Sequence, residues 1–293
     1  MRIAVMGATG FVGSHLVPHL AREGHHVVAV SRSGRRLPGW GDSVETRVAN
    51  VETGIGLADA LSGADAVVHL VAIPRETGGR RFDAVNVEGT RRIVEAASAA
   101  GVRRLVHLSV LGVTDEPRLR YLRSKWEGEQ LVRQSELDWV VLRPSIMFGE
   151  GDGFFNLIKT TLTWWSPGVT AIPGRGEERF QPLSVDDLAI AVERSAREQE
   201  RFRTMYELGG PDYWSYRQIV DEVMRVTGKR RLKLSLPVAL ISALAAVADR
   251  FLPIFPVSRD QIGSLGRPNF TDSDSFERAF GIRPRRLDLS YLA

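Results

Sequence analysis

Arg2-Ile3-Ala4-Val5-Met6-Gly7-Ala8-Thr9-Gly10-Phe11-Val12-Gly13 is the stretch that decides the fold of this chain. An apolar run ends at three glycines, Gly7, Gly10 and Gly13, and a helical pattern follows at once, which predicts a strand, a tight turn and a helix. We expect Gly7 to permit the turn, Gly10 to let the backbone approach a pyrophosphate, and Gly13 to allow close helix–strand packing. The free N–H groups and the positive dipole end of that helix favour an anion.

Three glycines in seven residues can also form a purely structural turn, and a glycine match alone is a weak signal. Here the glycines follow a strand and begin a helix, which favours a dinucleotide site over a structural turn. We therefore expect Thr9, Phe11 and Val12, which lie among the glycines, to join them in holding a cofactor.

The composition is that of an ordinary globular protein of about two domain-sized units. A net charge of +4, spread over short basic clusters, indicates a solvated surface rather than a nucleic-acid site. The chain has no cysteine, which excludes disulfides and thiolate chemistry and is compatible with a reducing compartment. Because Met1 leads directly into the first strand, we expect no signal peptide and a cytoplasmic protein.

Strands and helices alternate along the chain after the glycine turn. Further strands are expected at 26–30, 43–49, 66–71, 103–109 and 138–143. Helices are expected at 11–23, 54–62, 82–100 and 121–134. This alternation predicts an α/β fold, a Rossmann-like doubly wound parallel sheet with right-handed crossovers.

The second half of the chain predicts a smaller substrate-binding cap. Two segments, 150–176 and 209–293, do not continue the winding; the first is rich in glycine and aromatic residues, and the second holds helical patterns at 216–226 and 238–252. A strand at 180–185, a helix at 186–197 and a strand at 205–208 return to the sheet. We therefore expect a dinucleotide-binding domain of 1–149 that also receives 177–208, with the cap over the carboxyl edge of the sheet.

The end of the second strand points to the form of the cofactor. NAD-selective folds place an Asp or Glu there to bind the ribose 2′-hydroxyl, about 20 residues beyond the glycines. This chain has Ser31 and Arg32, with Arg35 close behind, and guanidinium groups can grip a 2′-phosphate in bidentate fashion. NADP(H) is favoured over NAD(H), the alternative being an ordinary basic loop.

The chemistry centres on Tyr121-Leu122-Arg123-Ser124-Lys125, early in a helix. Residues four apart share a helical face, so Tyr121 and Lys125 can point at one target. A phenol is a poor proton donor until a nearby ammonium stabilises its phenolate, which Lys125 can do while holding the nicotinamide ribose. Ser109, at the end of the fifth strand, can bind the substrate oxygen, and Asn86 can anchor a water in a proton relay.

This Ser–Tyr–Lys set with its glycine turn resembles the short-chain dehydrogenase/reductase superfamily, in particular its extended, epimerase/dehydratase-like and atypical branches. The segments Asn86-Val87-Glu88-Gly89-Thr90 and His69-Leu70-Val71-Ala72 are similar to signatures of that superfamily. The resemblance implies that Ser109, Tyr121, Lys125 and Asn86 are catalytic. It also implies that strand ends meet the cofactor at Asn50, Val51, Leu70, Val71, Ala72 and Pro144.

The resemblance sharpens toward one atypical branch, which contains the short-chain-dehydrogenase-like accessory subunit of respiratory complex I and its bacterial relatives. It is carried by three segments and the tail Val257-Ser258-Arg259-Asp260-Gln261. The three segments are Leu142-Arg143-Pro144-Ser145-Ile146-Met147-Phe148-Gly149, Gln181-Pro182-Leu183-Ser184-Val185-Asp186-Asp187-Leu188-Ala189 and Tyr206-Glu207-Leu208-Gly209-Gly210-Pro211. Because that subunit keeps NADPH as a structural group, the resemblance also implies a non-catalytic alternative.

Three functions are therefore weighed. The first is an NADP(H)-dependent oxidoreductase acting on an apolar carbonyl, alcohol or quinone-like substrate; the second is an NADP(H)-binding assembly or sensor protein. The third is a nucleotide-sugar epimerase or dehydratase. It is disfavoured because the interval from Ser109 to Tyr121 is shorter than the resemblance to typical sugar-nucleotide epimerases would imply. A respiratory-complex partner or peripheral membrane contact is an open alternative, and oligomeric state is undetermined.

Two further groups of side chains have an ordinary structural interpretation. Trp164 and Trp165 can line an apolar substrate pocket, although simple cap packing is favoured. His15 and His19 lie four apart like a metal pair, but with no third ligand in view we expect no metal site.

Overall fold

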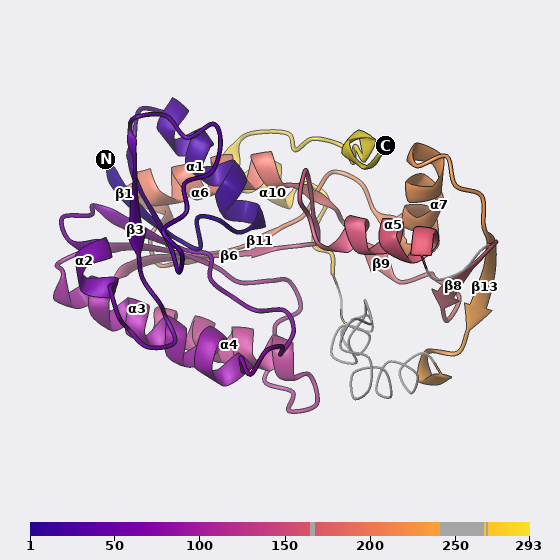
Figure 1. The fold of residues 1–293 in the computed structure, drawn as a ribbon, viewed down its shortest axis with the longest axis horizontal. Coiled ribbons are helices and arrows are strands. Elements are labelled where there is room, and N and C mark those ends of the chain that lie inside the picture. Colours follow the sequence, from indigo (N-terminus) through magenta and orange to yellow (C-terminus); the bar gives the residue numbers. More distant parts are fainter. Residues whose placement is uncertain (165–167, 241–266, 268) are drawn as a thin grey trace. The chain divides into compact units, whose positions relative to one another are not determined.

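A computed structural model describes residues 1–164, 168–240, 267 and 269–293 of the chain (Figure 1). These residues form two compact units. The first joins Met1–Pro144 to Val185–Glu207, and the second joins Ser145–Ser184 to Leu208–Ala293. Within the described residues, no helix combines the length and the apolar character that a membrane crossing requires.

The first unit is built on a seven-stranded sheet. Its strands are β1 (Arg2–Met6), β2 (His26–Ser31), β3 (Val44–Val48), β4 (Ala66–His69), β5 (Arg104–Leu108), β6 (Asp138–Pro144) and β11 (Thr204–Leu208). They lie in the order β11-β6-β5-β4-β1-β2-β3. All pairs from β3 through to β6 are parallel. The doubly wound α/β fold predicted from the strand–helix alternation is confirmed.

Helices cover both faces of this sheet (Figure 1). On one face lie α1 (Phe11–Arg22) and α6 (Val185–Arg197). On the other lie α2 (Leu57–Leu61), α3 (Glu88–Ala99), α4 (Arg120–Arg133) and the single π-helical turn η1 (Asp83–Val87) that leads into α3. The core on this second face joins Met6, Val67 and Leu105 from the strands to Phe82 and Ile93 from the helices.

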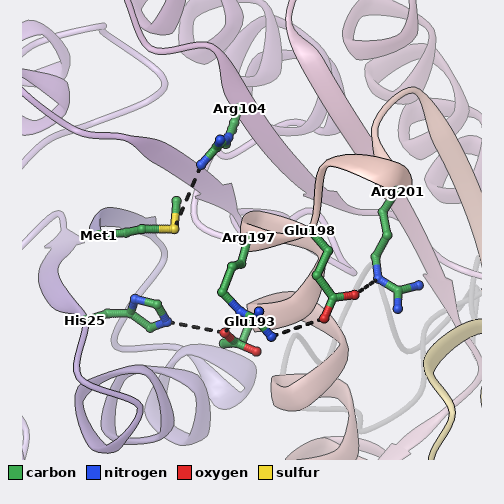
Figure 2. A network of polar contacts seen from close by, with 7 residues as sticks. All are labelled: Met1, His25, Arg104, Glu193, Arg197, Glu198 and Arg201. Carbon is green, nitrogen blue, oxygen red and sulfur yellow. Dashed lines mark hydrogen bonds and ion pairs between the residues drawn. The ribbon is translucent and has the colours of Figure 1, made fainter.

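Helix α6 is tied to the start of the chain, although 160 and more residues separate them. The His25 imidazole contacts the Glu193 carboxylate at 3.4 Å, and the His15 imidazole contacts Asp186 at 3.0 Å. Glu193 also accepts from Arg197, and the contacts continue through Glu198 to Arg201 in the short 3-10 turn η2 (Gln199–Arg201), as Figure 2 shows. The first unit is therefore discontinuous in sequence. Its last segment, Val185–Glu207, comes after Ser145–Ser184, which belongs to the second unit.

The second unit holds short paired strands and two longer helices around its own core. Its elements are α5 (Phe154–Trp164), α7 (Tyr216–Val226), α10 (Ser275–Phe280) and η3 (Ser290–Leu292), with the strand pairs β7 (Met147–Phe148) with β10 (Leu183–Ser184), β9 (Arg179–Phe180) with β12 (Trp214–Ser215), and β8 (Val169–Pro173) with β13 (Leu232–Leu236). The core contains Phe155, Ile158, Phe180 and Ile219 among others.

The structure corrects several boundaries predicted from the sequence. Residues 145–149 and 177–184, expected in the dinucleotide-binding domain, belong to the second unit because β7, β9 and β10 pair there. The strand expected at 180–185 is two strands in different sheets, separated by Gln181 and Pro182. The helix expected at 82–100 begins with a π-turn. Most of the helix expected at 238–252, Trp165 and the tail 257–261 lie outside the described residues.

Candidate functional site

Every site residue predicted from the sequence lies in the first unit. Gly7, Asn50, Leu70 and Ser109 follow directly or within two residues after β1, β3, β4 and β5, while Ser31 and Pro144 end β2 and β6. Because these strands are parallel, their carboxyl ends meet at one edge of the sheet. Tyr121 and Lys125 lie on α4 and Asn86 in η1, the elements that cover one face of the sheet.

The turn from β1 to α1 has the geometry of an anion cradle. Gly7 has φ +89, and its N–H donates to the Val30 carbonyl at 3.0 Å. A side chain on Gly13 would come within 2.4 Å of the Gly7 carbonyl, so only glycine fits that helical position. Among the described residues no side chain caps α1, whose N-cap is Gly10, so its first N–H groups are available to a ligand. This local geometry fits a dinucleotide pyrophosphate.

The basic loop after β2 divides into a structural arginine and two open ones. Arg36 holds the loop, because its Nη1 donates to the Val44 carbonyl at 2.6 Å and its Nη2 to the Trp40 carbonyl at 2.7 Å. The Ser31 hydroxyl accepts from the Gly34 N–H at 3.1 Å. Within the described part of the chain, the exposed guanidinium groups of Arg32 and Arg35 make no hydrogen bond or ion pair.

The strand ends next to the turn pack closely on it. A side chain on Gly7 would meet Val71 Cγ2 at 3.3 Å, which places Val71 beside the glycine turn. The Asn50 side chain accepts from the Glu52 N–H at 2.9 Å and so shapes the loop after β3. Leu70, Val71 and Ala72 are half-buried, and the Pro144 carbonyl accepts from Leu111 N–H at 3.0 Å.

Asn86 is buried in the π-turn and uses its side-chain amide to join two segments. Its Oδ1 accepts from the Ile73 N–H at 2.9 Å, and its Nδ2 donates to the Ser124 hydroxyl at 2.9 Å and the Ile73 carbonyl at 3.2 Å. Both amide protons are therefore taken by protein partners. One lone pair of the carbonyl oxygen is left for the predicted relay water, and that role stays a prediction.

Tyr121 and Lys125 occupy successive turns of α4. The Tyr121 ring packs on Phe82 with centroids 5.9 Å apart, and among the described residues its hydroxyl has no hydrogen-bond partner. The Lys125 Nζ donates to the Leu108 carbonyl at 2.6 Å. Burial raises the pKa of Tyr121 to about 12 and lowers the pKa of Lys125 to about 8. The sequence led us to expect an acidified phenol; in this structure burial is the cause of the shift, and the shift has the opposite sign.

Ser109 faces a carboxylate. It is buried, and its hydroxyl donates to Glu129 Oε2 at 3.0 Å. Glu129 is fully buried on α4 and also accepts from Arg143 Nε at 2.9 Å and Nη2 at 2.7 Å. The predicted contact of Ser109 with substrate stays a prediction, since the hydroxyl proton is directed at Glu129 here.

Two buried histidines lie side by side beneath these groups. His69 of β4 and His107 of β5 are register partners with ring centroids 5.0 Å apart. His69 Nε2 contacts the Thr90 hydroxyl at 2.9 Å, and its Nδ1 accepts from the Val71 N–H at 3.3 Å, which fits one neutral tautomer. Neither ring nitrogen of His107 has a partner among the described residues. Burial, and then Lys125, lowers the pKa of His69 to about 3 and that of His107 well below its usual range.

Sequence reasoning missed Glu129, Arg143 and the histidine pair as members of this site. One signal was present, because Glu129 follows Lys125 by four residues and therefore shares its helical face. A carboxylate on the same face as a buried lysine is more often an ion-pair partner than a solvated charge.

Comparisons with known proteins support this assignment of the first unit. A model of NAD(P)H-binding proteins matches residues 7–161, which include the glycine turn, Asn86, Tyr121 and Lys125. The chain is 28% identical over 269 residues to the mitochondrial NADH-ubiquinone oxidoreductase 40 kDa subunit of Neurospora crassa, over 88% of this chain and 68% of the relative. This similarity confirms the branch expected from the sequence.

Two further matches are informative. The chain is 33% identical over 160 residues to the ceramide reductase of Caulobacter vibrioides, over 53% of this chain and 50% of that protein. The structure of MoeE5 in complex with UDP-glucose and NAD matches with a TM-score of 0.75 and 24% identity, over 100% of this chain and 96% of that one. At that identity the structural match shows a shared fold.

Proposed function

Because this chain belongs to the family of NAD(P)H-binding proteins, we propose that it is an oxidoreductase that transfers hydride between NADP(H) and an apolar carbonyl, alcohol or quinone-like substrate. Its first unit is an NAD(P)-binding Rossmann domain. The observation that carries the catalytic part is the pair on α4: a phenol with no partner among the described residues, one turn before a buried lysine.

The preference for NADP(H) rests on the loop after β2. No carboxylate stands at the end of β2 or in the five residues after it, and Arg32 and Arg35 are exposed there without a partner in the described structure. A guanidinium can hold a ribose 2′-phosphate by two parallel hydrogen bonds, and the N–H groups at the start of α1 would hold the pyrophosphate.

The bound cofactor would supply the hydride, and the chain's own residues would handle the proton. Tyr121 would donate its phenolic proton to the substrate oxygen. Its raised pKa keeps that proton in place at neutral pH, so the acid form is present when substrate binds. Lys125 would hold the nicotinamide ribose and stabilise the phenolate once the proton has left. With a pKa of about 8, Lys125 is largely cationic at pH 7.

An apolar substrate is favoured by the relative named ceramide reductase, which shares 33% identity over 160 residues with this chain. The likeness to MoeE5 supports the fold without extending to its UDP-glucose, so a nucleotide-sugar reaction remains a distant alternative.

The test is Tyr121→Phe in a screen of carbonyls and quinones followed by NADPH absorbance. We expect NADPH affinity to be nearly unchanged and turnover to fall by about 10²–10⁴-fold, the usual contribution of general acid catalysis. Tyr206→Phe, a tyrosine on β11, is the matched control and should keep wild-type rates.

The second candidate is a non-catalytic NADP(H)-binding partner of a respiratory complex. It is favoured by the similarity to the Neurospora 40 kDa subunit. It is also favoured by the hydrogen bond that the Ser109 hydroxyl donates to Glu129, which directs its proton away from a substrate. Absence of turnover across the screen, together with copurified NADPH that resists exchange, would decide for this candidate.

A further inference from the structure

Glu129 is the most deeply buried charge of the first unit that the proposed reaction leaves unused. Its exposed fraction is 0%, and a buried carboxylate is strongly unfavourable unless it is paired and hydrogen-bonded. Three hydrogen-bond donors meet it, the Ser109 hydroxyl at 3.0 Å, Arg143 Nε at 2.9 Å and Arg143 Nη2 at 2.7 Å, and Arg133 Nη1 lies 3.7 Å from Oε1. Such a complete set of partners indicates a built position.

These contacts fix α4 to the ends of two strands. Lys125 donates to the carbonyl of Leu108 at 2.6 Å, and Glu129, one turn later, accepts from the next residue, Ser109. The Arg143 guanidinium, at the end of β6, is also paired with Glu207 at 3.3 Å. Rotation or sliding of α4 would break both the Lys125 and the Glu129 contacts, and would carry Tyr121 with it.

Glu129 also acts on the charge of Lys125. Among the described residues, the titratable groups that interact electrostatically with Lys125 are His69 on β4, His107 on β5 and Glu129 on α4 itself. Tyr121 lies four residues before Lys125 on the same helix. The histidines and the phenol are neutral at pH 7, because burial lowers the pKa of both histidines and raises that of Tyr121. The carboxylate of Glu129 opposes the effect of burial on the Lys125 pKa.

We propose that Glu129 is a positioning residue of this site: it holds α4 on the ends of β5 and β6 and keeps the Lys125 ammonium charged. The proposal deepens the proposed function, because Lys125 is there assigned to the ribose and the phenol. Both roles of Glu129 belong to the cofactor-free protein, so they can be tested without measuring turnover.

Lys125 is titrated directly in the cofactor-free protein. The ¹³Cε resonance of Lys125, assigned by its loss in Lys125→Met, is followed from pH 6 to 11 in wild type and in Glu129→Gln. Removal of the carboxylate should lower the titration midpoint by about one pH unit or more, since the ammonium loses its opposite charge. Glu129→Asp keeps the charge and should restore the midpoint to within a few tenths of a unit.

A matched control lies on the same helix. Glu127 pairs with Arg123 on the exposed side at 2.8 Å, so Glu127→Gln removes the same charge and should leave the Lys125 midpoint where it is. An unchanged midpoint in Glu129→Gln, with only a loss of thermal stability, would overturn the proposal. If Glu129→Gln does not fold, the double variant Glu129→Gln with Arg143→Gln removes both charges of the buried pair. It should still lower the Lys125 midpoint, by less than Glu129→Gln alone, because the Arg143 cation is lost together with the carboxylate.

NADPH affinity, measured by fluorescence at pH 6.5 and pH 8, gives a second readout. Glu129→Gln should bind at least about threefold more weakly than wild type at pH 8 and lose less at pH 6.5, where a larger fraction of Lys125 is protonated in both proteins. Wild-type protein that does not bind NADPH at either pH would refute the proposed function, while the resonance titration would still decide the role of Glu129.

Discussion

His69 and His107 share a register position on neighbouring strands, yet their side chains have opposite hydrogen-bond states. His69 is satisfied by Thr90 and the Val71 N–H, whereas both ring nitrogens of His107 lack a partner in the described structure. An unsatisfied buried polar group costs about 1–3 kcal/mol, so the two residues should respond differently to the same substitution.

His107→Leu should leave the free energy of unfolding at pH 7 unchanged or raise it by about 1 kcal/mol, because no hydrogen bond is lost. His69→Leu, the matched control, should lower it by about 1–3 kcal/mol because two partners lose their bonds. Urea unfolding measures both. Equal losses in the two variants would show that His107 has a partner.

Arg32 and Arg35 carry the proposed choice of cofactor. Changing both to Ala should weaken NADPH binding by about ten- to a hundredfold and leave NADH binding nearly unchanged, since only NADPH has the 2′-phosphate. Calorimetric titration with each cofactor measures the ratio. An equal loss of NADH affinity would mean that Arg32 and Arg35 hold the loop in shape, as Arg36 does through its hydrogen bond to the Val44 carbonyl.

Among the elements, those of the first unit follow from the sequence because their apolar periods are long and regular. Helix α5 and the pair β8–β13 were missed, since α5 lies in a glycine-rich segment and β13 exposes two of its leucines. The glycine turn could be predicted because its three glycines lie within seven consecutive residues. Glu129 could not be found in this way, because its burial depends on partners 20 and 14 residues away, directly after β5 and on β6.

The turn between β1 and α1 yields a matched pair of glycine variants. Gly13→Ala should destabilise the protein by about 2 kcal/mol or more, because the new methyl group meets the Gly7 and Ala8 backbone at 2.4–2.6 Å. Gly10→Ala meets only the Gly7 carbonyl, at 3.3 Å, and should fold while binding NADPH more weakly. Thermal unfolding and cofactor titration separate the effects. If Gly10→Ala bound NADPH with wild-type affinity, the assignment of the pyrophosphate to this turn would be wrong.

At the scale of the whole molecule, the buried histidines predict sensitivity to acid. The folded chain binds the His69 proton only near pH 3, whereas the unfolded chain binds it near pH 6.5. The unfolded state therefore holds more protons between these values, and stability falls as pH falls through that window, by about 1.4 kcal/mol per unit for this residue. Urea midpoints from pH 7 to 5 should decline, and less steeply in His107→Leu. A flat profile would mean that the folded and unfolded chains take up protons alike, so that burial does not shift the titration of the two histidines.

The discontinuous first unit has a consequence for the ribosome. Helix α6 and strand β11, which contact α1 and extend the sheet beside β6, are translated only after the whole of Ser145–Ser184. At elongation rates of about 5–20 residues per second, synthesis from Ser145 to the end of β11 at Leu208 takes roughly 3–13 seconds. During this time the β6 edge of the nascent sheet and the face of α1 that contacts α6 stay uncovered. A nascent chain in this interval presents an open edge strand that can pair with another chain. The amount of folded protein made in cells should therefore depend on chaperones that bind nascent chains and on the speed of translation between Pro144 and Val185.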